Sequence, residues 1–175
     1  RTVAEVAAYC GYREGNYALV DLSAEQVEHG YSRGMSVHTV GRTWRDAELR
    51  IVFGKLRSHP VHLVHLNVGN LDSISAPAES FLFLDRRADL DTCVLMTLED
   101  HPPHFALIDG FDAAAHGLAG VLGCPAPLAP GRLYGGADTL AVDLVAARHA
   151  GLARPEASPM LALAMEWFGD PRPLT

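Results

Sequence analysis

The chain has 175 residues, of which 49% are hydrophobic and 20% are charged. This length suits one domain that buries most of its apolar surface, and the composition excludes an intrinsically disordered chain. The 21 acidic residues outnumber the 14 basic ones, and the net charge of −7 argues against binding to nucleic-acid phosphates. We also expect no membrane partner, because no apolar run approaches the roughly 20 residues that span a bilayer and no signal-peptide pattern opens the sequence.

The first third of the sequence predicts two helices and several strands. Thr2 and Glu5 form a capping box that begins the first helix, and Gly11 is placed to end it. A second capping box begins at Ser23 and predicts a short helix that ends near Gly30. Strands are predicted for three short runs: 17–22, 36–40 and 49–54. Because no strand precedes the first helix, we expect an α/β domain that lacks its N-terminal strand, either through trimming or as a short member of its family.

The middle of the sequence predicts one helix and three buried strands. Pro60 is tolerated in a first helical turn, and apolar residues recur on one face over 60–71, so a helix is expected there. Three apolar runs are expected to form buried strands: 81–84, 93–96 and 105–108. Residues 117–131 are rich in glycine, proline and alanine and predict a loop.

The last third predicts a strand and two helices. Residues 132–134 suit a strand, and Asp138 or Thr139 is expected to cap a helix that reaches His149. An apolar helix over 160–168 follows and offers a surface for a homodimer. Strands that alternate with capped helices predict a single α/β domain across the whole chain, with a mixed, mostly parallel sheet and helices on both of its faces.

The three cysteines, Cys10, Cys93 and Cys124, are far apart, and no C-x-x-C pair occurs. This usage disfavours a disulfide framework, a zinc ribbon and a self-contained iron–sulfur cluster. It fits a reducing compartment, so the expected location is the cytoplasm.

Two cations mark the first candidate site. Lys55 and Arg57 lie between a predicted strand and the predicted helix over 60–71, which is where open α/β sheets place ligands. The amino end of that helix adds partial positive charge and free N–H groups, so the segment favours a carboxylate or phosphate. The alternative is that both are solvated loop cations and Ser58 is only a helix cap.

Three histidines, His59, His62 and His65, recur at steps of three in the same region. On a helix this spacing lets two imidazoles approach one ion or one substrate, and neutral imidazole binds zinc, iron or nickel or acts as a general base. Histidines on a mostly apolar helix are also common as core or interface residues, and this alternative stays open.

Two aspartates are expected to face the same pocket. Asp138 follows two glycines that let the backbone approach a ligand closely, although it is equally well explained as a helix cap. Asp109 follows the predicted strand 105–108, again at a carboxyl end. Asp143 is expected to bond a neighbouring loop or to pair with an arginine.

These segments resemble a known family. Residues 55–60, running into 66–71, are similar to the K-x-K-T-H … K-N signature of the domain-of-unknown-function 362 family. Its G-x-D-P-x-A-x-D helix, G-L segment and V-D-G strand end are matched by these stretches: 136–143, 151–152 and 108–110. The resemblance covers roughly residues 1–170. It departs from the family pattern at three positions: Arg57 replaces a lysine, Thr139 replaces a proline, and Gly69 stands where a lysine is usual before Asn70.

The resemblance implies an α/β fold and a shared pocket, but no established reaction. Because members are often fused to ferredoxin-type modules and this chain has no cysteine set for a cluster, it also implies a separate iron–sulfur protein as a partner.

Taken together, these observations predict an enzyme that acts on a small anionic metabolite at the carboxyl ends of the strands. The alternative is a non-catalytic module that binds a metal or cofactor, or a subunit of a redox complex. The residues predicted to be catalytic are Lys55, His59 and Asp109. The residues predicted to bind substrate are Arg57, Ser58, Asn70, Gly136 and Asp138, with Lys55 and Asp138 in one cavity. The sequence specifies neither a cofactor nor a metal.

Overall fold

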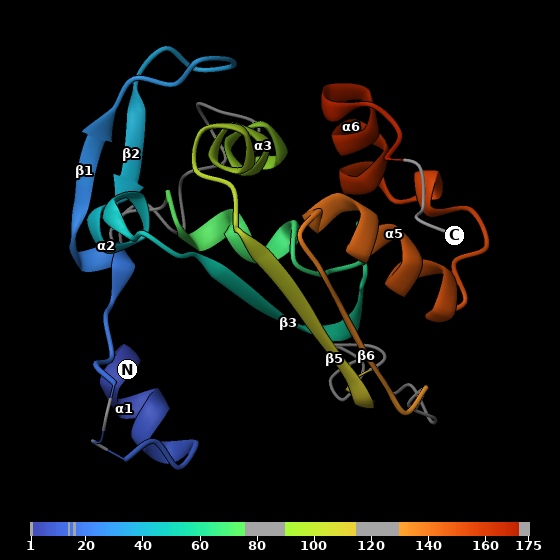
Figure 1. Cartoon of the computed structure of the whole chain (residues 1–175), viewed down its shortest axis with the longest axis horizontal. Helices are drawn as coiled ribbons and strands as arrows, with labels where there is room; N and C mark the ends of the chain where they lie inside the picture. The colour runs from blue at the N-terminus through green and yellow to red at the C-terminus, as the bar shows by residue number, and fades with distance from the viewer. Residues whose placement is uncertain (1, 14, 16, 76–89, 115–129, 172–175) are drawn as a thin grey trace.

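The computed structural model describes residues 2–13, 15, 17–75, 90–114 and 130–171. Its larger sheet has the strand order β4-β3-β5-β6 (Figure 1). The strands are β3 (Ile51–His59), β4 (Leu63–Val64), β5 (Phe105–Ala114) and β6 (Arg132–Gly136). β3 and β5 are parallel, whereas β4 and β6 join the sheet antiparallel. The predicted α/β composition and mixed sheet are confirmed; a mostly parallel sheet is not, because two of its three described strand pairs are antiparallel.

Helices pack on one face of this sheet. Along β3, Val52, Gly54 and Leu56 are buried, whereas Ile51 and Phe53 on the alternate face are 49% and 65% exposed. The covering helices are α3 (Leu90–Asp100), α5 (Thr139–His149) and α6 (Pro159–Phe168), which lie on the same side of the strands (Figure 1). Within the described part of the chain the opposite face carries no helix, so the expectation of helices on both faces is not confirmed.

Three predicted helices are confirmed because local side chains define their ends. α1 (Val3–Tyr9) begins with the expected capping box, in which the Thr2 hydroxyl accepts from the Glu5 N–H and the Glu5 carboxylate accepts from the Thr2 N–H. Asp138 caps α5, and Ser158 caps α6 after a short 3₁₀ turn at Pro155–Ala157. α6 ends at Gly169, whose φ of 87° glycine adopts without strain.

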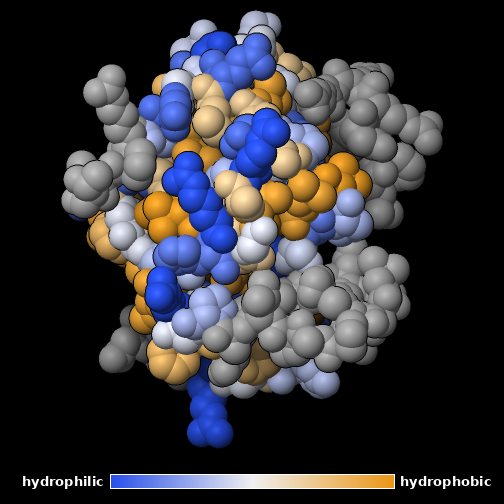
Figure 2. Space-filling model, turned by 90° about the vertical axis from the view of Figure 1, so that its right-hand side faces the viewer, coloured by the Kyte–Doolittle hydropathy of each residue, from blue (hydrophilic) through white to orange (hydrophobic). Residues whose placement is uncertain are grey.

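The surface around the last helix bears on the predicted homodimer. α6 turns Met160, Leu161 and Ala164 into the core. Figure 2 shows the side of the molecule that lies to the right in Figure 1, and there hydrophobic and hydrophilic residues are mixed. A homodimer through this helix stays a prediction.

A small second sheet replaces two elements expected near the N-terminus. β1 (Gln26–His29) pairs antiparallel with β2 (His38–Gly41), and the short helix α2 (Arg42–Asp46) follows. The predicted helix at Ser23 is wrong: a 3₁₀ turn (Leu22–Ala24) capped by Asp21 leads straight into β1. The predicted strand over 17–22 is also wrong, because this segment is an exposed coil up to Asp21.

The predicted helix over 60–71 is wrong. β3 continues to His59, where its last residues pair with β4, and a 3₁₀ turn (Gly69–Ser73) follows. Pairing with β4 and β5 outweighed the helical spacing of the valines. The predicted strand over 93–96 lies inside α3, because Cys93 to Leu98 are all buried and a continuous apolar run does not distinguish a buried helix from a strand. The expected strand at 81–84 and most of the loop at 117–131 lie outside the described residues.

Candidate functional site

A pocket of about 650 Å³ opens beside β3. Its polar wall comprises Arg57, His59, His65, Asn70 and Asp72. Its apolar wall comprises Leu22, Trp44, Ile51, Phe53 and Ile74. The volume lies within the range of small-molecule sites.

Arg57 supplies the positive charge of the pocket. Alternation along β3 places it on the same face as Phe53 and His59. Its Nη2 donates to Asn70 Oδ1 at 3.4 Å, and its backbone carbonyl accepts from the His65 N–H at 3.0 Å. Among the residues that the structure describes, no carboxylate forms an ion pair with Arg57. Its charge is therefore available to an anion.

His59 is arranged as a hydrogen-bond donor. Its Nδ1 accepts the backbone N–H groups of Val61 and His62, at 3.3 and 3.0 Å. The neutral ring therefore carries its proton on Nε2. Burial, followed by the nearby His62 and Arg57, lowers the pKa of His59. A general base here would have to accept a proton at a nitrogen already occupied, so the geometry does not support the predicted proton transfer by His59.

The pKa values of His65 and Asp72, which also line the pocket, are shifted. Burial, with Arg57 and the neighbouring histidines, lowers the pKa of His65 to about 4, so this ring is neutral at pH 7. Burial raises the pKa of Asp72, although the Ser73 N–H and Arg57 oppose the shift. A weakly basic imidazole and a carboxyl with raised pKa in one pocket are candidates for exchanging protons with a ligand.

The segment that carries His65 and Asn70 is held in place by Asp143. Asp143 on α5 is completely buried, and its carboxylate accepts the backbone N–H groups of Asn67 and Val68 at 3.1 and 2.7 Å. This confirms the expectation that Asp143 bonds a neighbouring loop. Burial raises its pKa to about 7, although these hydrogen bonds act in the opposite direction.

Gly54 lets the same segment approach β3. A Cβ atom at this position would lie 2.7 Å from Asn67 Oδ1 and 3.0 Å from Asn70 Nδ2. Any larger residue would push Asn67 and Asn70 away from the strand. Asn70 would then lose its hydrogen bond with Arg57.

Lys55 and Asp109 neutralise each other outside the pocket. Lys55 Nζ lies 2.6 Å from Asp109 Oδ2, and Asp109 Oδ1 accepts the Phe111 N–H at 2.9 Å. The Lys55 hydrogen bond is the main reason why the pKa of Asp109 is lowered. Neither residue lines the pocket that contains Arg57. Their predicted catalytic roles therefore have no support from its geometry.

The remaining predicted residues lie elsewhere. Ser58 is on β3, paired with Val64, and caps no helix because none begins there. Gly136 pairs with Ala106 near the start of β5, whereas Lys55 pairs with Asp109 further along. Asp138 follows Gly136 and lines a different pocket, of about 400 Å³. Neither this pocket nor the one beside β3 is lined by both Lys55 and Asp138.

The three histidines do come together, but through a turn instead of a helix. The ring centroids of His59 and His62 are 4.9 Å apart and those of His59 and His65 are 5.7 Å apart. Nδ1 of His59 is engaged by backbone N–H groups, as described above. Within the described ranges no three histidine, cysteine, aspartate or glutamate side chains are arranged to hold a metal ion.

Sequence reasoning missed Trp44 and Asp72. Trp44 reaches the pocket from α2, and its orientation is set by a hydrogen bond from Nε1 to the carbonyl of His101 at 3.1 Å. Asp72 carries only a weak local signal, a carboxylate between apolar residues just after Asn70. Both depend on contacts between segments that are distant in the sequence.

No family model matches the sequence, and no curated protein or solved structure matches the chain. The resemblance to the domain-of-unknown-function 362 family therefore stays a prediction. Of the helices described, none is long and apolar enough to cross a bilayer.

Proposed function

We propose that the pocket beside β3 binds a small monoanion with an apolar body, such as an aromatic or aliphatic carboxylate. The observation that supports this most is Arg57, a cation that lines the pocket without an ion-pair partner in the described part of the chain. Arginine binds carboxylates through two parallel hydrogen bonds, and the Nε2–H of His59 adds a neutral donor.

The apolar wall and Asp72 define the rest of the ligand. Trp44 and Phe53 offer aromatic surface, and burying one phenyl ring against such a wall is worth on the order of 2 kcal/mol. Asp72 places a carboxyl group in the same pocket, which disfavours a dianion through repulsion between like charges. The ligand is therefore a carboxylate in preference to a phosphate ester.

Benzoate tests this proposal. We expect it to bind more tightly than acetate or inorganic phosphate, as measured by isothermal titration calorimetry and by amide shifts of the pocket residues. Arg57→Gln is expected to weaken benzoate binding about 10- to 100-fold, because a hydrogen bond to a charged group contributes roughly 1.5–3 kcal/mol. Arg154→Gln is the matched control, because Arg154 is exposed and pairs with Glu156. Equal loss in both variants, or no preference for benzoate over phosphate, contradicts the proposal.

A catalytic role is the second candidate, and the presence of Asp72 and His65 in one pocket favours it. A carboxyl with a raised pKa and an imidazole with a lowered pKa line one pocket, which is typical of acid–base sites. In this case the protein is an enzyme that transfers a proton to or from the bound carboxylic acid.

Asp72→Asn separates catalysis from binding. Wild-type protein is incubated with α-hydroxy, α-keto and α-amino acids that have apolar side chains, and product is followed by NMR. Asp72→Asn is expected to abolish turnover while binding benzoate as tightly as wild type or more so, since a repelling charge is gone. Unchanged turnover in this variant rules out Asp72 as the proton-transfer group, and absence of turnover by wild type favours a binding module.

A further inference from the structure

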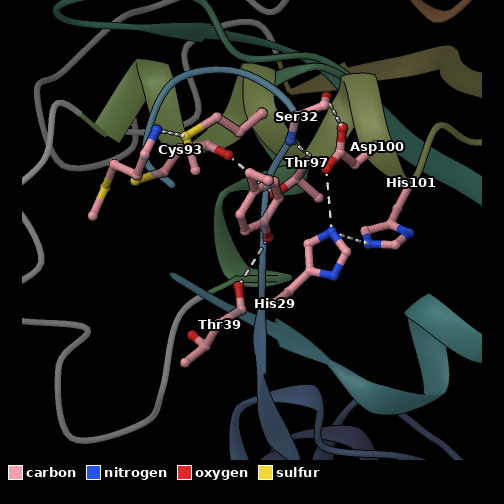
Figure 3. Close-up of polar contacts among 10 residues, drawn as sticks. His29, Ser32, Thr39, Cys93, Thr97, Asp100 and His101 are labelled. Carbon is pink, nitrogen blue, oxygen red and sulfur yellow. Dashed lines mark hydrogen bonds and ion pairs between the residues drawn. The ribbon is translucent and has the colours of Figure 1, made fainter. Parts of the chain in front are cut away.

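A polar cluster joins the β1–β2 hairpin to the C-terminal end of α3 (Figure 3). Asp100 Oδ2 accepts the Ser32 N–H at 3.0 Å and lies 3.2 Å from His29 Nε2, while the Ser32 hydroxyl donates to Asp100 Oδ1. On the other side of His29, its Nε2 lies 3.1 Å from His101 Nε2. In Figure 3 the two imidazoles face each other beside Asp100.

The two facing ring nitrogens hold a single proton between them. At 3.1 Å one nitrogen donates and the other accepts, since two N–H groups would repel. Because the carboxylate oxygen Oδ2 of Asp100 faces His29 Nε2 at 3.2 Å and can only accept, the proton belongs on His29 Nε2, and His101 Nε2 offers its lone pair. A proton on His101 Nε2 as well would set two N–H groups against each other and break the contact.

The hairpin depends on docking of this kind. A two-stranded sheet is marginally stable by itself in water. Besides the cluster, two residues hold the segment between β1 and β2. Arg33 Nη1 donates to the Trp167 carbonyl at 3.0 Å, and its guanidinium lies 4.1 Å from the Trp167 ring centre. The Met35 N–H donates to Met96 Sδ on α3 at 3.0 Å. Tyr31 is buried, with its ring edge-on to His29 at 4.6 Å.

We propose that His29, His101 and Asp100 form an acid-operated latch, which holds the hairpin on α3 while one proton lies between the two Nε2 atoms and releases it when His101 Nε2 takes up a second proton. The surroundings of His101 also disfavour its protonation. Burial, His29 and Arg50 lower the pKa of His101, with Asp100 opposing them. The charged groups that act on the cluster from the packed elements are Asp100 at the end of α3, Arg50 before β3, and Arg45 and Asp46 on α2.

The sign of the pH dependence follows from the released state. A released His101 takes up its proton near its ordinary pKa of 6.5, whereas the docked ring resists protonation to lower pH. Docking is therefore favoured above pH 6.5 and weakens as the pH falls below it. The pKa of Asp100 is also lowered: burial alone would raise it, but the hydrogen bonds of Ser32 and His29 outweigh that effect. Its contribution is lost only in stronger acid.

Hydrogen exchange of the whole chain tests the latch. Between pH 7 and pH 5, corrected for intrinsic rates, protection of a peptide covering 26–41 is expected to fall relative to one covering α5, because the pKa of His101 is lower in the docked state than in the released one. His101→Gln retains an acceptor for His29 but does not titrate, and it is expected to remove this pH dependence. His149→Gln, which alters a histidine next to Tyr134, serves as the control and keeps it.

Histidine ring NMR on wild-type protein gives a second test that needs no variant. In the docked protein the ring of His101 is expected to take up its proton below its ordinary pKa of 6.5, with the hairpin amides following the same titration, and this result supports the latch. Titration of His101 at its ordinary pKa, pH-independent protection, or a pH dependence that survives in His101→Gln overturns it.

Discussion

The Asp143→Asn variant is expected to gain stability over wild type as the pH rises from 4 to 8, by on the order of 4 kcal/mol across that range. Asp143 ionises with a pKa of about 7 in the folded protein but near 3.8 when exposed to water. Its contribution to folding is fully present below pH 3.8 and is lost as the pH rises through 7, at roughly 1.4 kcal/mol per pKa unit. Asparagine imitates the neutral acid and has no charge to bury.

Urea unfolding of both proteins at pH 4, 6 and 8 provides the measurement. At pH 4 the variant is expected to be the less stable of the two, because its amide group accepts only one of the two N–H groups that Asp143 holds. Asp138→Asn is a suitable control, since Asp138 is an exposed cap on the same helix. A difference between variant and wild type that stays constant with pH would mean that Asp143 is not a buried ionising group.

The His65→Gln variant is expected to show the opposite trend. Folding lowers the pKa of His65 from 6.5 to about 4, so wild type loses stability as the pH falls from 6.5 towards 4. The variant lacks this group and should gain on wild type by on the order of 3 kcal/mol over the same interval. His104→Gln, an exposed histidine, is the control. A His65→Gln difference that does not grow in acid contradicts a neutral His65 in the folded protein.

The two groups have opposing effects on wild type. Between pH 4 and 6.5, Asp143 lowers the stability as the pH rises and His65 raises it. His65 belongs to the segment 65–70, and Asp143 bonds the backbone of that segment. The pH-dependent contributions of Asp143 and His65 to wild-type stability therefore largely cancel. Each single variant is expected to show a pH dependence of the free energy of unfolding that wild type does not show.

Local signals in the sequence were sufficient for the ends of three helices. Thr2, Asp138 and Ser158 each accept an N–H from the first turn that follows, an interaction within four residues that needs no other part of the chain. Helices and strands that depend on contacts between residues far apart in the sequence were not predictable in this way. Within 60–71, Leu63 and Val64 form a strand by pairing with the end of β3. Residues 93–96 lie in a helix, although a continuous apolar run suits a buried helix and a buried strand equally.

The candidate site was predictable in one strand only. Arg57 and His59 were singled out as neighbours in the sequence, and alternation along β3 places both on the face that borders the pocket. Asn70 was expected there too and bonds Arg57. The opposite wall comes from Leu22 and Trp44, whose positions depend on how the small sheet docks. The spacing of residues in the sequence does not predict how the β1–β2 sheet packs against the rest of the protein.

Trp44 belongs to two parts of the protein at once. Its ring forms part of the pocket wall, while its Nε1–H bonds the carbonyl of His101, whose imidazole faces His29. Under the two proposals, a bound aromatic acid contacts this indole, and release of the hairpin changes the surroundings of His101, its hydrogen-bond partner. We therefore expect Trp44 fluorescence to respond both to ligand binding and to pH.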